Sequence, residues 1–216
     1  MDAEEIFRDS SDWYLRSPSP FSGRVLEFAL RNSGHEVLDV GCAVGEYSRR
    51  LNQAGHECIG VDINKEYLAR AAQKAVQVGI MDAAHLGFAD RSFDTVLLVE
   101  VLEHVEDPKV VIQEAKRVSK GTVVITVPNC SDFHRLRESG LTYEHMLERG
   151  HRNFFTKRDL EELLNSQFKS AKVTEGDPIE PCGILGSRIL RYVVRVANGM
   201  GVGRRVHSRL YAVAEV

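Results

Sequence analysis

A turn of small residues between two apolar segments is the first place where this sequence could do chemistry. Gly41, Ala43 and Gly45 follow an apolar run that ends at Val40, and Asp62 ends a second apolar run. Small residues let the backbone approach a ligand closely, and a carboxylate one strand away can accept hydrogen bonds from ribose hydroxyls. The pattern therefore predicts a site for a ligand that carries a nucleoside. A structural interpretation stays open, in which the glycines only form a tight turn and Asp62 caps the next helix.

The details of this turn indicate which nucleoside ligand fits. Dinucleotide-binding enzymes carry Gly-x-Gly-x-x-Gly, whereas Ala43 and Glu46 replace the second and third glycines here. A pyrophosphate binds at a helix N-terminus, where the carboxylate of Glu46 would repel it. The sequence therefore favours a cofactor without phosphate, such as S-adenosylmethionine (SAM), over a nicotinamide cofactor and an oxidoreductase.

A second group of polar residues follows the fourth expected strand. On a helix, Glu100, Glu103 and His104 would lie at positions i, i+3 and i+4 and share one face. Two carboxylates and an imidazole suit Mg²⁺ or Mn²⁺, with His151 as a further ligand and His145 as its competitor. In the alternative interpretation no metal binds, Glu100 and His104 hydrogen-bond locally, and Glu103 is solvated.

His151 has another candidate role that needs no metal. An imidazole with a pKa near neutrality can take a proton from an attacking hydroxyl group. We therefore expect His151, Glu100 and His104 to be the catalytic candidates. The structural alternative for His151 is a loop residue that caps the helix near Thr156.

The segments that position these residues alternate between strand and helix patterns. The expected strands are residues 36–40, 57–62, 76–81, 93–99 and 122–127, one near 168–174, and 208–216; the expected helices are residues 21–33, 44–53, 65–74, 108–119, 157–164 and 186–198. This order predicts an α/β fold: a single doubly wound, Rossmann-like domain with a mostly parallel seven-stranded sheet and helices on both faces.

We expect this single domain to span residues 1–216 and to have four parts. The parts are N-terminal helices or a lid (1–33), a cofactor-binding core (34–128), a substrate-side insertion (129–155), and C-terminal helices and strands (156–216). Residues 129–155 interrupt the alternation just past the fifth expected strand, at the edge where such sheets bind ligands.

Composition narrows the class of protein. The chain has 216 residues, of which 43% are hydrophobic and 27% charged, as in ordinary globular domains. A net charge of −3 argues against general nucleic-acid binding. No apolar run approaches the roughly 20 residues of a membrane span, the acidic N-terminus is unlike a signal peptide, and the four cysteines form no CxxC pair. We therefore expect a cytoplasmic protein with reduced thiols, and composition indicates no particular oligomeric state.

Several motifs, taken in order, resemble those of the class I SAM-dependent methyltransferases, and more narrowly their type 11 group. The matching motifs are Asp39-x-Gly41-x-Ala43-x-Gly45, Asp62, Asp82-Ala83 and Phe93-Asp94-x-Val96. The resemblance covers about residues 34–130, with a weaker similarity at 151–165. Ala43 is the departure, because the family usually has glycine there.

The resemblance implies a role for each matching residue around SAM. On the methionine side, Gly41, Ala43 and Gly45 would line the chain, Asp39 would lie near the amino group, and Val99 would lie under the sulfonium. On the nucleoside side, Asp62 would bind the ribose, Ile63 would pack on the adenine, Asp82 would accept from the adenine amino group, and the Ala83 backbone would contact the ring.

The segment after the fourth strand resembles two metal-assisted families. Ubiquinone-biosynthesis O-methyltransferases carry a similar Glu-x-x-Glu-His. Small-RNA 3′-end 2′-O-methyltransferases carry it with a distant histidine five residues before a threonine, as His151 precedes Thr156 here. This resemblance implies a metal ion that would hold a substrate hydroxyl and lower its pKa.

We therefore expect an enzyme that transfers a methyl group from SAM to a small-molecule acceptor, at oxygen. One alternative is a metal-assisted RNA 2′-O-methyltransferase, against which the net charge and the lack of an RNA-binding domain count. Another is a SAM-binding partner protein without catalysis.

Two further sets of residues each have a functional and a structural interpretation. Phe133, Tyr143, Phe154 and Phe155 would form an apolar wall for the acceptor, or belong to the core. Residues 186–209 are locally basic, with Arg188, Arg191, Arg195, Arg204, Arg205 and Arg209. They would contact an anionic membrane surface, or form an amphipathic helix packed on the sheet with a solvated arginine face.

Overall fold

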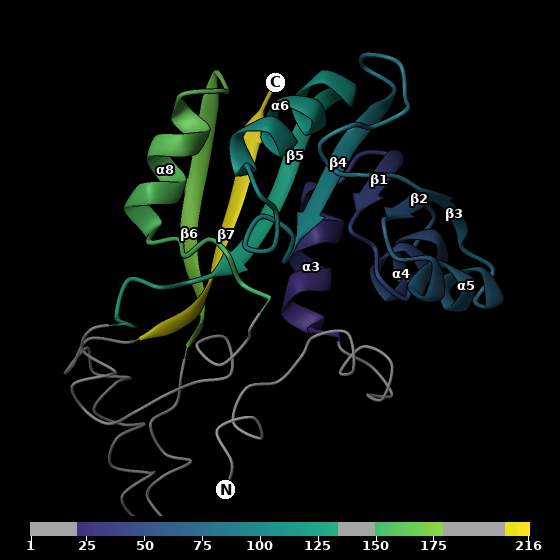
Figure 1. Ribbon diagram of the computed structural model, residues 1–216, viewed down its shortest axis with the longest axis horizontal. Coiled ribbons are helices and arrows are strands. Elements are labelled where there is room, and N and C mark those ends of the chain that lie inside the picture. Colours follow the sequence, from purple (N-terminus) through teal and green to yellow (C-terminus); the bar gives the residue numbers. More distant parts are fainter. Residues whose placement is uncertain (1–20, 134–149, 179–205) are drawn as a thin grey trace, which may run out of the picture.

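Strands and helices alternate along the chain, as the sequence predicts (Figure 1). The computed structural model describes residues 21–133, 150–178 and 206–216. The helices are α3 (Gly23–Asn32), α4 (Glu46–Gln53), α5 (Lys65–Gln73), α6 (Pro108–Val118) and α8 (Lys157–Asn165); the strands are β1 (Glu36–Val40), β2 (Glu57–Asp62), β3 (Gln77–Ile80), β4 (Phe93–Val99), β5 (Ser119–Pro128), β6 (Ser170–Pro178) and β7 (His207–Glu215). Each expected strand is present, as is each expected helix within the described ranges, with ends shifted by a few residues.

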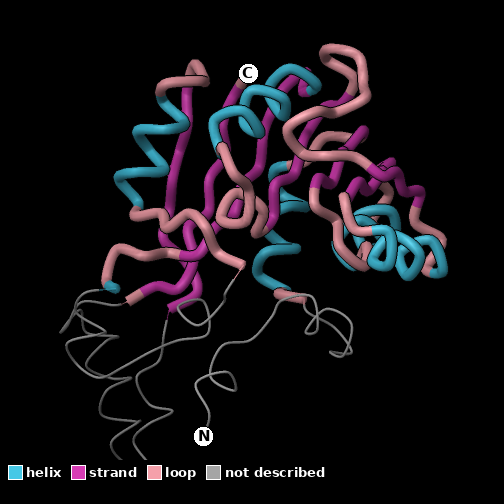
Figure 2. The backbone as a smooth tube through the Cα atoms, in the orientation of Figure 1, coloured by secondary structure: helices cyan, strands magenta, loops and turns pink. Residues whose placement is uncertain are grey.

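The strands form one seven-stranded sheet in the order β3-β2-β1-β4-β5-β7-β6 (Figure 2). The pairs from β3 to β5 are parallel, and β7 runs antiparallel to both of its neighbours. This arrangement confirms the predicted Rossmann-like fold. The chain order reverses between β1 and β4, and sheets of this kind bind ligands at that point, beyond the carboxyl ends of the strands.

Helices cover both faces of the sheet, as β4 illustrates. On one face, Leu97 and Val99 belong to a cluster with apolar residues of α3 and α4. On the other face, Val96 and Leu98 belong to a cluster with residues of α6 and α8. Because both faces of β4 are covered, its run of apolar side chains is almost wholly buried, as expected for a central parallel strand.

Asn64 caps helix α5 and thereby decides one open point about Asp62. The Asn64 side-chain oxygen accepts hydrogen bonds from the backbone N–H groups of Glu66 and Tyr67, at 2.9 and 3.3 Å. The interpretation of Asp62 as the cap of this helix is therefore wrong. The carboxylate of Asp62 lies two residues before the cap, at the end of β2.

A loop, residues 81–92, connects β3 to β4, where parallel strands are usually joined by a helix. The guanidinium of Arg117, from α6, holds this loop. It donates to the carbonyl oxygens of Leu86 and Phe88, both at 2.8 Å, and to the side chains of Asp90 and Glu114. These hydrogen bonds, together with the burial of Leu86 in the core, fix the backbone that leads from β3 to β4.

Some predictions fall outside the described ranges. These are the lid or helices within residues 1–20, the helix at 186–198 with its arginines, and the side chains of Tyr143 and His145. In the part of the chain that the structure describes, no helix is long and apolar enough to cross a membrane.

Candidate functional site

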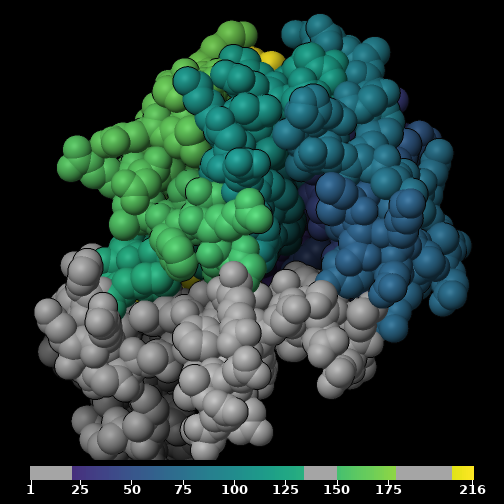
Figure 3. All heavy atoms as spheres, in the orientation of Figure 1, coloured from purple at the N-terminus to yellow at the C-terminus, as the bar shows by residue number. Residues whose placement is uncertain are grey.

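The candidate site lies at the carboxyl edge of the parallel strands. The loop of small residues, Gly41 to Gly45, follows β1, Asp62 ends β2, and Glu100 follows β4. Figure 3 shows a recess between the blue and the green parts of the surface. Strands on the two sides of the chain reversal therefore contribute to one site.

The loop after β1, called the glycine loop below, has a backbone that only small residues tolerate well. Gly41, Ala43 and Gly45 all have positive φ angles, of 72°, 47° and 70°. A Cβ atom on Gly41 would lie 2.6 Å from Cγ2 of Val101, and one on Gly45 would lie 2.7 Å from Cβ of Ala71. Ala43 keeps its methyl group in the left-handed region at a cost of about 1–2 kcal/mol. The loop is therefore tightly packed between the turn after β4 and helix α5.

Asp62 holds the glycine loop, and Asp39 ties β1 to the helix that follows the loop. Asp62 accepts the N–H of Ala43 on Oδ2 at 2.9 Å and the N–H of Asn64 on Oδ1 at 2.8 Å. Asp39, buried in β1, accepts from the hydroxyl of Ser48 at 2.6 Å. Burial raises the pKa of Asp39 to about 6, although the Ser48 hydrogen bond opposes the shift. Asp62 is only half-buried, so its carboxylate remains accessible to a ligand.

Exposed apolar side chains flank Asp62 on the β3 side. Ile63 is 70% exposed, and Ile80, which pairs with Asp62 in the sheet, is 58% exposed. Asp82 is exposed, and its carboxylate accepts from the N–H of Ala84 at 2.9 Å, next to the half-buried Ala83. This edge of the site therefore offers apolar surface beside a carboxylate, which suits a flat heterocycle.

Residues 100–105 form turns, so the expected helix for the Glu-x-x-Glu-His segment is wrong. Glu100 has a φ of 54°, and its N–H donates to the carbonyl of Thr126 at 3.0 Å. Its carboxylate accepts from the hydroxyl of Thr126 at 2.8 Å. The group of possible metal ligands comprises Glu103, His104 and His151, without Glu100. Glu100 thus lies outside this group, although its charge still acts on Glu103.

Glu103, His104 and His151 do come together, with ligand atoms within 4.8 Å of one another. Glu103 is 1% exposed, and neither of its carboxylate oxygens has a hydrogen-bond partner among the described residues. Burial raises the pKa of Glu103 well above its usual range, and the nearby charge of Glu100 acts in the same direction. The alternative in which Glu103 is solvated is therefore wrong.

The two histidines lie side by side with different supports. Nδ1 of His104 lies 3.1 Å from the carbonyl of Gly150, so this nitrogen carries the proton and donates. The ring centroids of His104 and His151 are 4.8 Å apart at an interplanar angle of 63°. Thr156 itself caps helix α8, in a capping box with Asp159, so His151 is not the cap.

Asn153, which sequence reasoning did not single out, ties the two histidine-bearing segments together. Its side-chain amide donates to the carbonyls of Leu102 and Val105, at 3.0 and 2.7 Å. Its backbone N–H donates to the carbonyl of Glu103 at 3.0 Å. The segment that begins at Gly150 is thereby fastened to the turn after β4, which brings His151 to His104.

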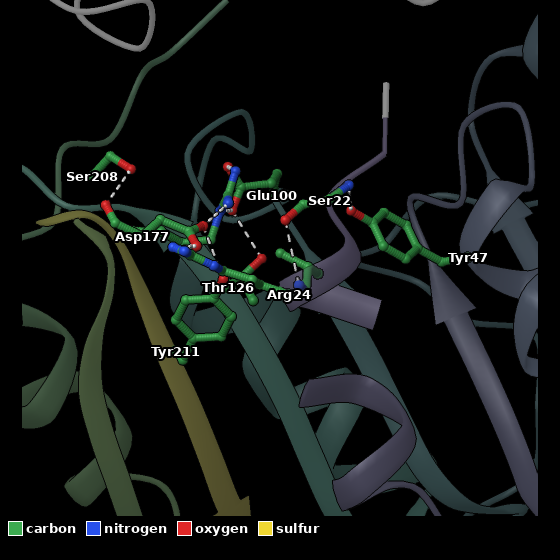
Figure 4. A network of polar contacts seen from close by, with 10 residues as sticks. Ser22, Arg24, Tyr47, Glu100, Thr126, Asp177, Ser208 and Tyr211 are labelled. Carbon is green, nitrogen blue, oxygen red and sulfur yellow. Dashed lines mark hydrogen bonds and ion pairs between the residues drawn. The ribbon is translucent and has the colours of Figure 1, made fainter. Parts of the chain in front are cut away.

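A buried ion network on the other side of Glu100 was also missed (Figure 4). Arg209, near the start of β7, donates from Nε to the Glu100 carboxylate at 3.0 Å and from a terminal nitrogen to Asp177. Asp177 also accepts from the hydroxyl of Tyr211 at 2.9 Å and from Arg24 at 3.3 Å. The Arg209 side chain is only 15% exposed. Its assignment to a basic membrane-contacting surface is therefore wrong, because two carboxylates enclose its charge.

Comparison with known proteins identifies the family. The sequence profile described as a methyltransferase domain matches residues 15–167, which is more than half of the chain. The chain belongs to this methyltransferase family. This result confirms the resemblance to class I methyltransferases and the expectation of an enzyme, and it contradicts the nicotinamide oxidoreductase alternative.

Curated relatives of this methyltransferase share only part of their length with it. An uncharacterized protein of Methanocaldococcus jannaschii is 32% identical over 145 residues, covering 64% of this chain and 66% of that protein. A ubiquinone biosynthesis O-methyltransferase of Haemophilus ducreyi is 37% identical over 98 residues, covering 40% and 42%. The matched stretch thus spans less than two-thirds of either relative.

Solved structures share the fold of the methyltransferase. A SAM-dependent methyltransferase from Archaeoglobus fulgidus has a TM-score of 0.70 at 21% identity, covering 89% of this chain and 91% of its own. Magnesium protoporphyrin IX methyltransferase from Synechocystis, with bound SAH, has a TM-score of 0.60 at 20% identity, covering 89% and 81%. A [4+2]-cyclase, SpnF, has the same fold at a TM-score of 0.58 and 17% identity, covering 88% and 79%. The fold therefore does not determine the reaction by itself.

Proposed function

We propose that this methyltransferase transfers a methyl group from SAM to an oxygen atom of a small-molecule acceptor. The observation that carries the proposal is the bond between Asp62 and the glycine loop. One carboxylate fixes the loop through the N–H of Ala43 and stays half-buried at the end of β2. A nucleoside cofactor at this edge would have its ribose at Asp62 and its amino-acid part along the loop.

The neighbouring residues would complete the cofactor site. Adenine packed on Ile63 and Ile80 would cover apolar surface that is otherwise in water, which is favourable. The remaining proposed contacts are Gly41, Ala43 and Gly45 with the methionine moiety, Asp39 with its amino group, Val99 with the sulfonium, and Asp82 and Ala83 with the adenine edge.

The proposed reaction is a single displacement at the methyl carbon. The acceptor oxygen forms a bond to this carbon while the carbon–sulfur bond breaks, and the sulfur keeps the electron pair and becomes a neutral thioether. The acceptor proton passes to a base, the role we propose for His151, with His104 beside it. The rate depends chiefly on holding oxygen, carbon and sulfur in line in a dry site.

The acceptor class is proposed from the relatives and from the side chains near His151. A ubiquinone biosynthesis O-methyltransferase among the relatives supports oxygen. Phe154 is 53% exposed, and its ring lies 5.9 Å from that of Phe133 and 6.5 Å from that of His151. These rings would form an apolar wall for an acceptor, whereas Phe155 is buried in the core.

A screen with labelled SAM tests the acceptor. Phenols, sugars, lipids, amines and RNA should be compared, since another relative is a phosphatidylethanolamine N-methyltransferase of Cereibacter sphaeroides. We expect label on the oxygen of a small molecule. Label on RNA alone would contradict this proposal and favour the RNA 2′-O-methyltransferase alternative.

The cofactor site is tested with Asp62→Ala and calorimetric titration of SAM. Loss of the acceptor would leave the bound ribose hydroxyls without this hydrogen-bond partner, at a cost of about 1–3 kcal/mol, so SAM affinity should fall about five- to more than a hundredfold. Glu57→Ala, at the exposed opposite end of the same strand, is the matched control and should bind SAM normally. Equal SAM affinity in the Asp62→Ala and wild-type proteins would show that the cofactor lies elsewhere.

A divalent metal ion is a second candidate component, and one observation favours it. The buried Glu103 carboxyl has no hydrogen-bond partner among the described residues and lies beside two imidazoles. This donor set fits an ion such as Mn²⁺ or Mg²⁺. Glu103, His104 and His151 would hold the ion, which would lower the pKa of an acceptor hydroxyl.

Electron paramagnetic resonance with Mn²⁺ tests the metal without knowledge of the acceptor. If the ion binds at this site, Glu103→Gln should weaken Mn²⁺ binding about tenfold or more, because a charged ligand is lost. Glu106→Gln changes an exposed carboxylate three residues away and should have no effect. Absence of Mn²⁺ binding by the wild-type protein at millimolar concentration would remove the metal and leave His151 as the base.

A further inference from the structure

Glu100 and Glu103 belong to one five-residue motif, yet their carboxylates have opposite surroundings. Neither oxygen of Glu103 has a hydrogen-bond partner in the described part of the chain. Glu100 accepts from Arg209 at 3.0 Å and from the Thr126 hydroxyl at 2.8 Å, with its side chain 14% exposed. The second nitrogen of the Arg209 fork lies 3.5 Å from the other oxygen of Glu100. The guanidinium of Arg209 thus binds the Glu100 carboxylate from the side of β7.

A second carboxylate, that of Asp177, holds the Arg209 guanidinium in place. Arg209 donates to Asp177, which accepts from the hydroxyl of Tyr211 at 2.9 Å. Asp177 has a φ of 54°, so both carboxylates that grip Arg209 come from residues in the left-handed region. Such strain persists only where the surroundings fix the residue. Although burial disfavours its charge, Glu100 and Asp177 hold the pKa of Arg209 above its ordinary value.

A separate hydrogen bond, between Tyr47 and Ser22, lies on the cofactor side of the proposed site. Tyr47 lies in the first turn of α4, and its hydroxyl accepts from the N–H of Ser22 at 3.0 Å (Figure 4). Burial raises the pKa of Tyr47 to about 12, and the charges of Arg209 and Glu100 shift it in opposite directions. The charges of the Glu100–Arg209 pair therefore act on a residue of the helix that leaves the glycine loop.

We propose that Arg209 is a positioning residue. Its guanidinium binds the Glu100 carboxylate where a divalent cation would otherwise bind. It holds the Glu100 carboxylate at the end of β4 and keeps it out of the group formed by Glu103, His104 and His151. Any cation at that group then has three protein donors instead of four. This inference uses the proposed function only to place the pair in the methyltransferase site.

Repulsion between the carboxylates of Glu100 and Glu103 is the physical reason why a cation is needed at Glu100. Two carboxylates close together in a buried site attract a cation, because each raises the cost of ionising the other. Arg209 supplies that positive charge permanently and in a fixed fork geometry. Without it, Glu100 and Glu103 would form a pair of carboxylates with no resident counter-charge from β7, and a divalent ion would restore the balance.

The experiment compares Arg209→Met with Arg209→Lys by Mn²⁺ paramagnetic resonance on the full chain. Arg209→Met should bind Mn²⁺ about tenfold or more tightly than the wild-type protein, and Glu100→Gln in the same chain should abolish this gain. Arg209→Lys should behave like the wild-type protein, because a cation remains at Glu100. A merely structural brace would give no such separation of the two variants. Equal Mn²⁺ affinity in the Met variant and the wild type would overturn the proposal.

A measurement on the wild-type protein covers the case in which Arg209→Met fails to fold. The ¹⁵N resonance of Arg209 Nε reports its bond to Glu100, and it should be shifted by Glu100→Gln. It should stay unchanged when millimolar Mg²⁺ is added; movement toward a free guanidinium would show that the metal recruits Glu100 and would contradict the proposal. Arg158→Met, which breaks an exposed pair on α8, is the control. SAM titration is independent of these outcomes, so failure of the cofactor site would be recognised separately.

Discussion

The two halves of the proposed site, a cofactor half and an acceptor half, are built from residues at different separations along the chain. The cofactor half runs from Asp39 to Ala83, and its parts follow one another directly in β1, β2, β3 and their connections. The acceptor half joins His104 to Gly150 across 46 positions and Glu100 to Arg209 across 109. Local segments specify the first half, whereas the second exists only once the sheet has assembled.

The halves also differ in how they hold a buried acid. In the cofactor half, Asp39 is buried but accepts a hydrogen bond from Ser48. In the acceptor half, Glu103 is buried without a hydrogen-bond partner among the described residues. A partnered acid stabilises a fixed loop, whereas an unpartnered one is costly and is retained typically at functional sites. Of the two acids, Glu103 is therefore the better candidate for a chemical role in the proposed site.

The largest expected effect breaks the cofactor half alone. Gly45→Ala adds a Cβ 2.7 Å from that of Ala71, at a φ of 70°. Left-handed strain and overpacking together should lower the free energy of unfolding by about 2–5 kcal/mol. Gly55→Ala is the control, since its φ is 97° and no atom lies within 4 Å of the new Cβ. Chemical denaturation measures both, and equal losses would mean that the contact with Ala71 is unimportant.

A pH titration of stability sharpens the contrast between the two acids. Burial raises the pKa of Glu103 above its model-peptide value of 4.5, so the folded protein holds a proton that the unfolded chain releases. Below pH 4.5 this group contributes its full stabilisation. The contribution falls by about 1.4 kcal/mol per pH unit as the pH rises from there toward the pKa of the folded state. Glu103→Gln, which cannot ionise, should escape this loss.

Asp39→Asn is the matched variant for the cofactor half. Burial raises the pKa of Asp39 only to about 6. The difference in the free energy of unfolding between Asp39→Asn and the wild type should therefore change between about pH 4 and pH 6 and stay constant above that range. Urea unfolding at a series of pH values follows both variants. If the stability difference between Glu103→Gln and the wild type did not change with pH, Glu103 would not be a buried acid in solution.

The smallest expected effect loosens the acceptor half without touching the cofactor half. Asn153→Ala removes the two hydrogen bonds to Leu102 and Val105 and leaves their carbonyls without this donor. The free energy of unfolding should fall by about 1–3 kcal/mol, while SAM affinity stays unchanged. Thermal unfolding and calorimetry measure the two quantities. Weaker SAM binding in this variant would show that the halves are coupled.

The sequence predicts the cofactor half better because its signals are local. Apolar runs mark β1, β2 and β4, and the small residues after β1 correspond to the left-handed loop that the structure contains. The helix expected from Glu100 fails because its backbone N–H bonds to Thr126, a strand away, and its φ is positive. No local pattern contains that information.

The contacts of the residues that sequence reasoning missed depend on pairing between strands that are distant in the sequence. Arg209 reaches Glu100 because β7 inserts antiparallel beside β5, with Arg209 opposite Pro128. From sequence alone, Arg209 belongs to a run of basic residues near the C-terminus, and solvation is the natural expectation for such a run. Asp177 precedes a proline, and nothing in its local sequence indicates the positive φ and the buried ion pairs that it has near the end of β6.

The way in which the loop between β3 and β4 is held has an evolutionary consequence. Leu86 is buried in the core and Phe88 packs against it, and Arg117 adds hydrogen bonds to the carbonyls of both residues. Asp82 next to this stretch is exposed, so a change of its side chain need not disturb the sheet. At the proposed cofactor site, preference for one nucleobase over another could then change in descendants of this protein while their folding remains under separate selection.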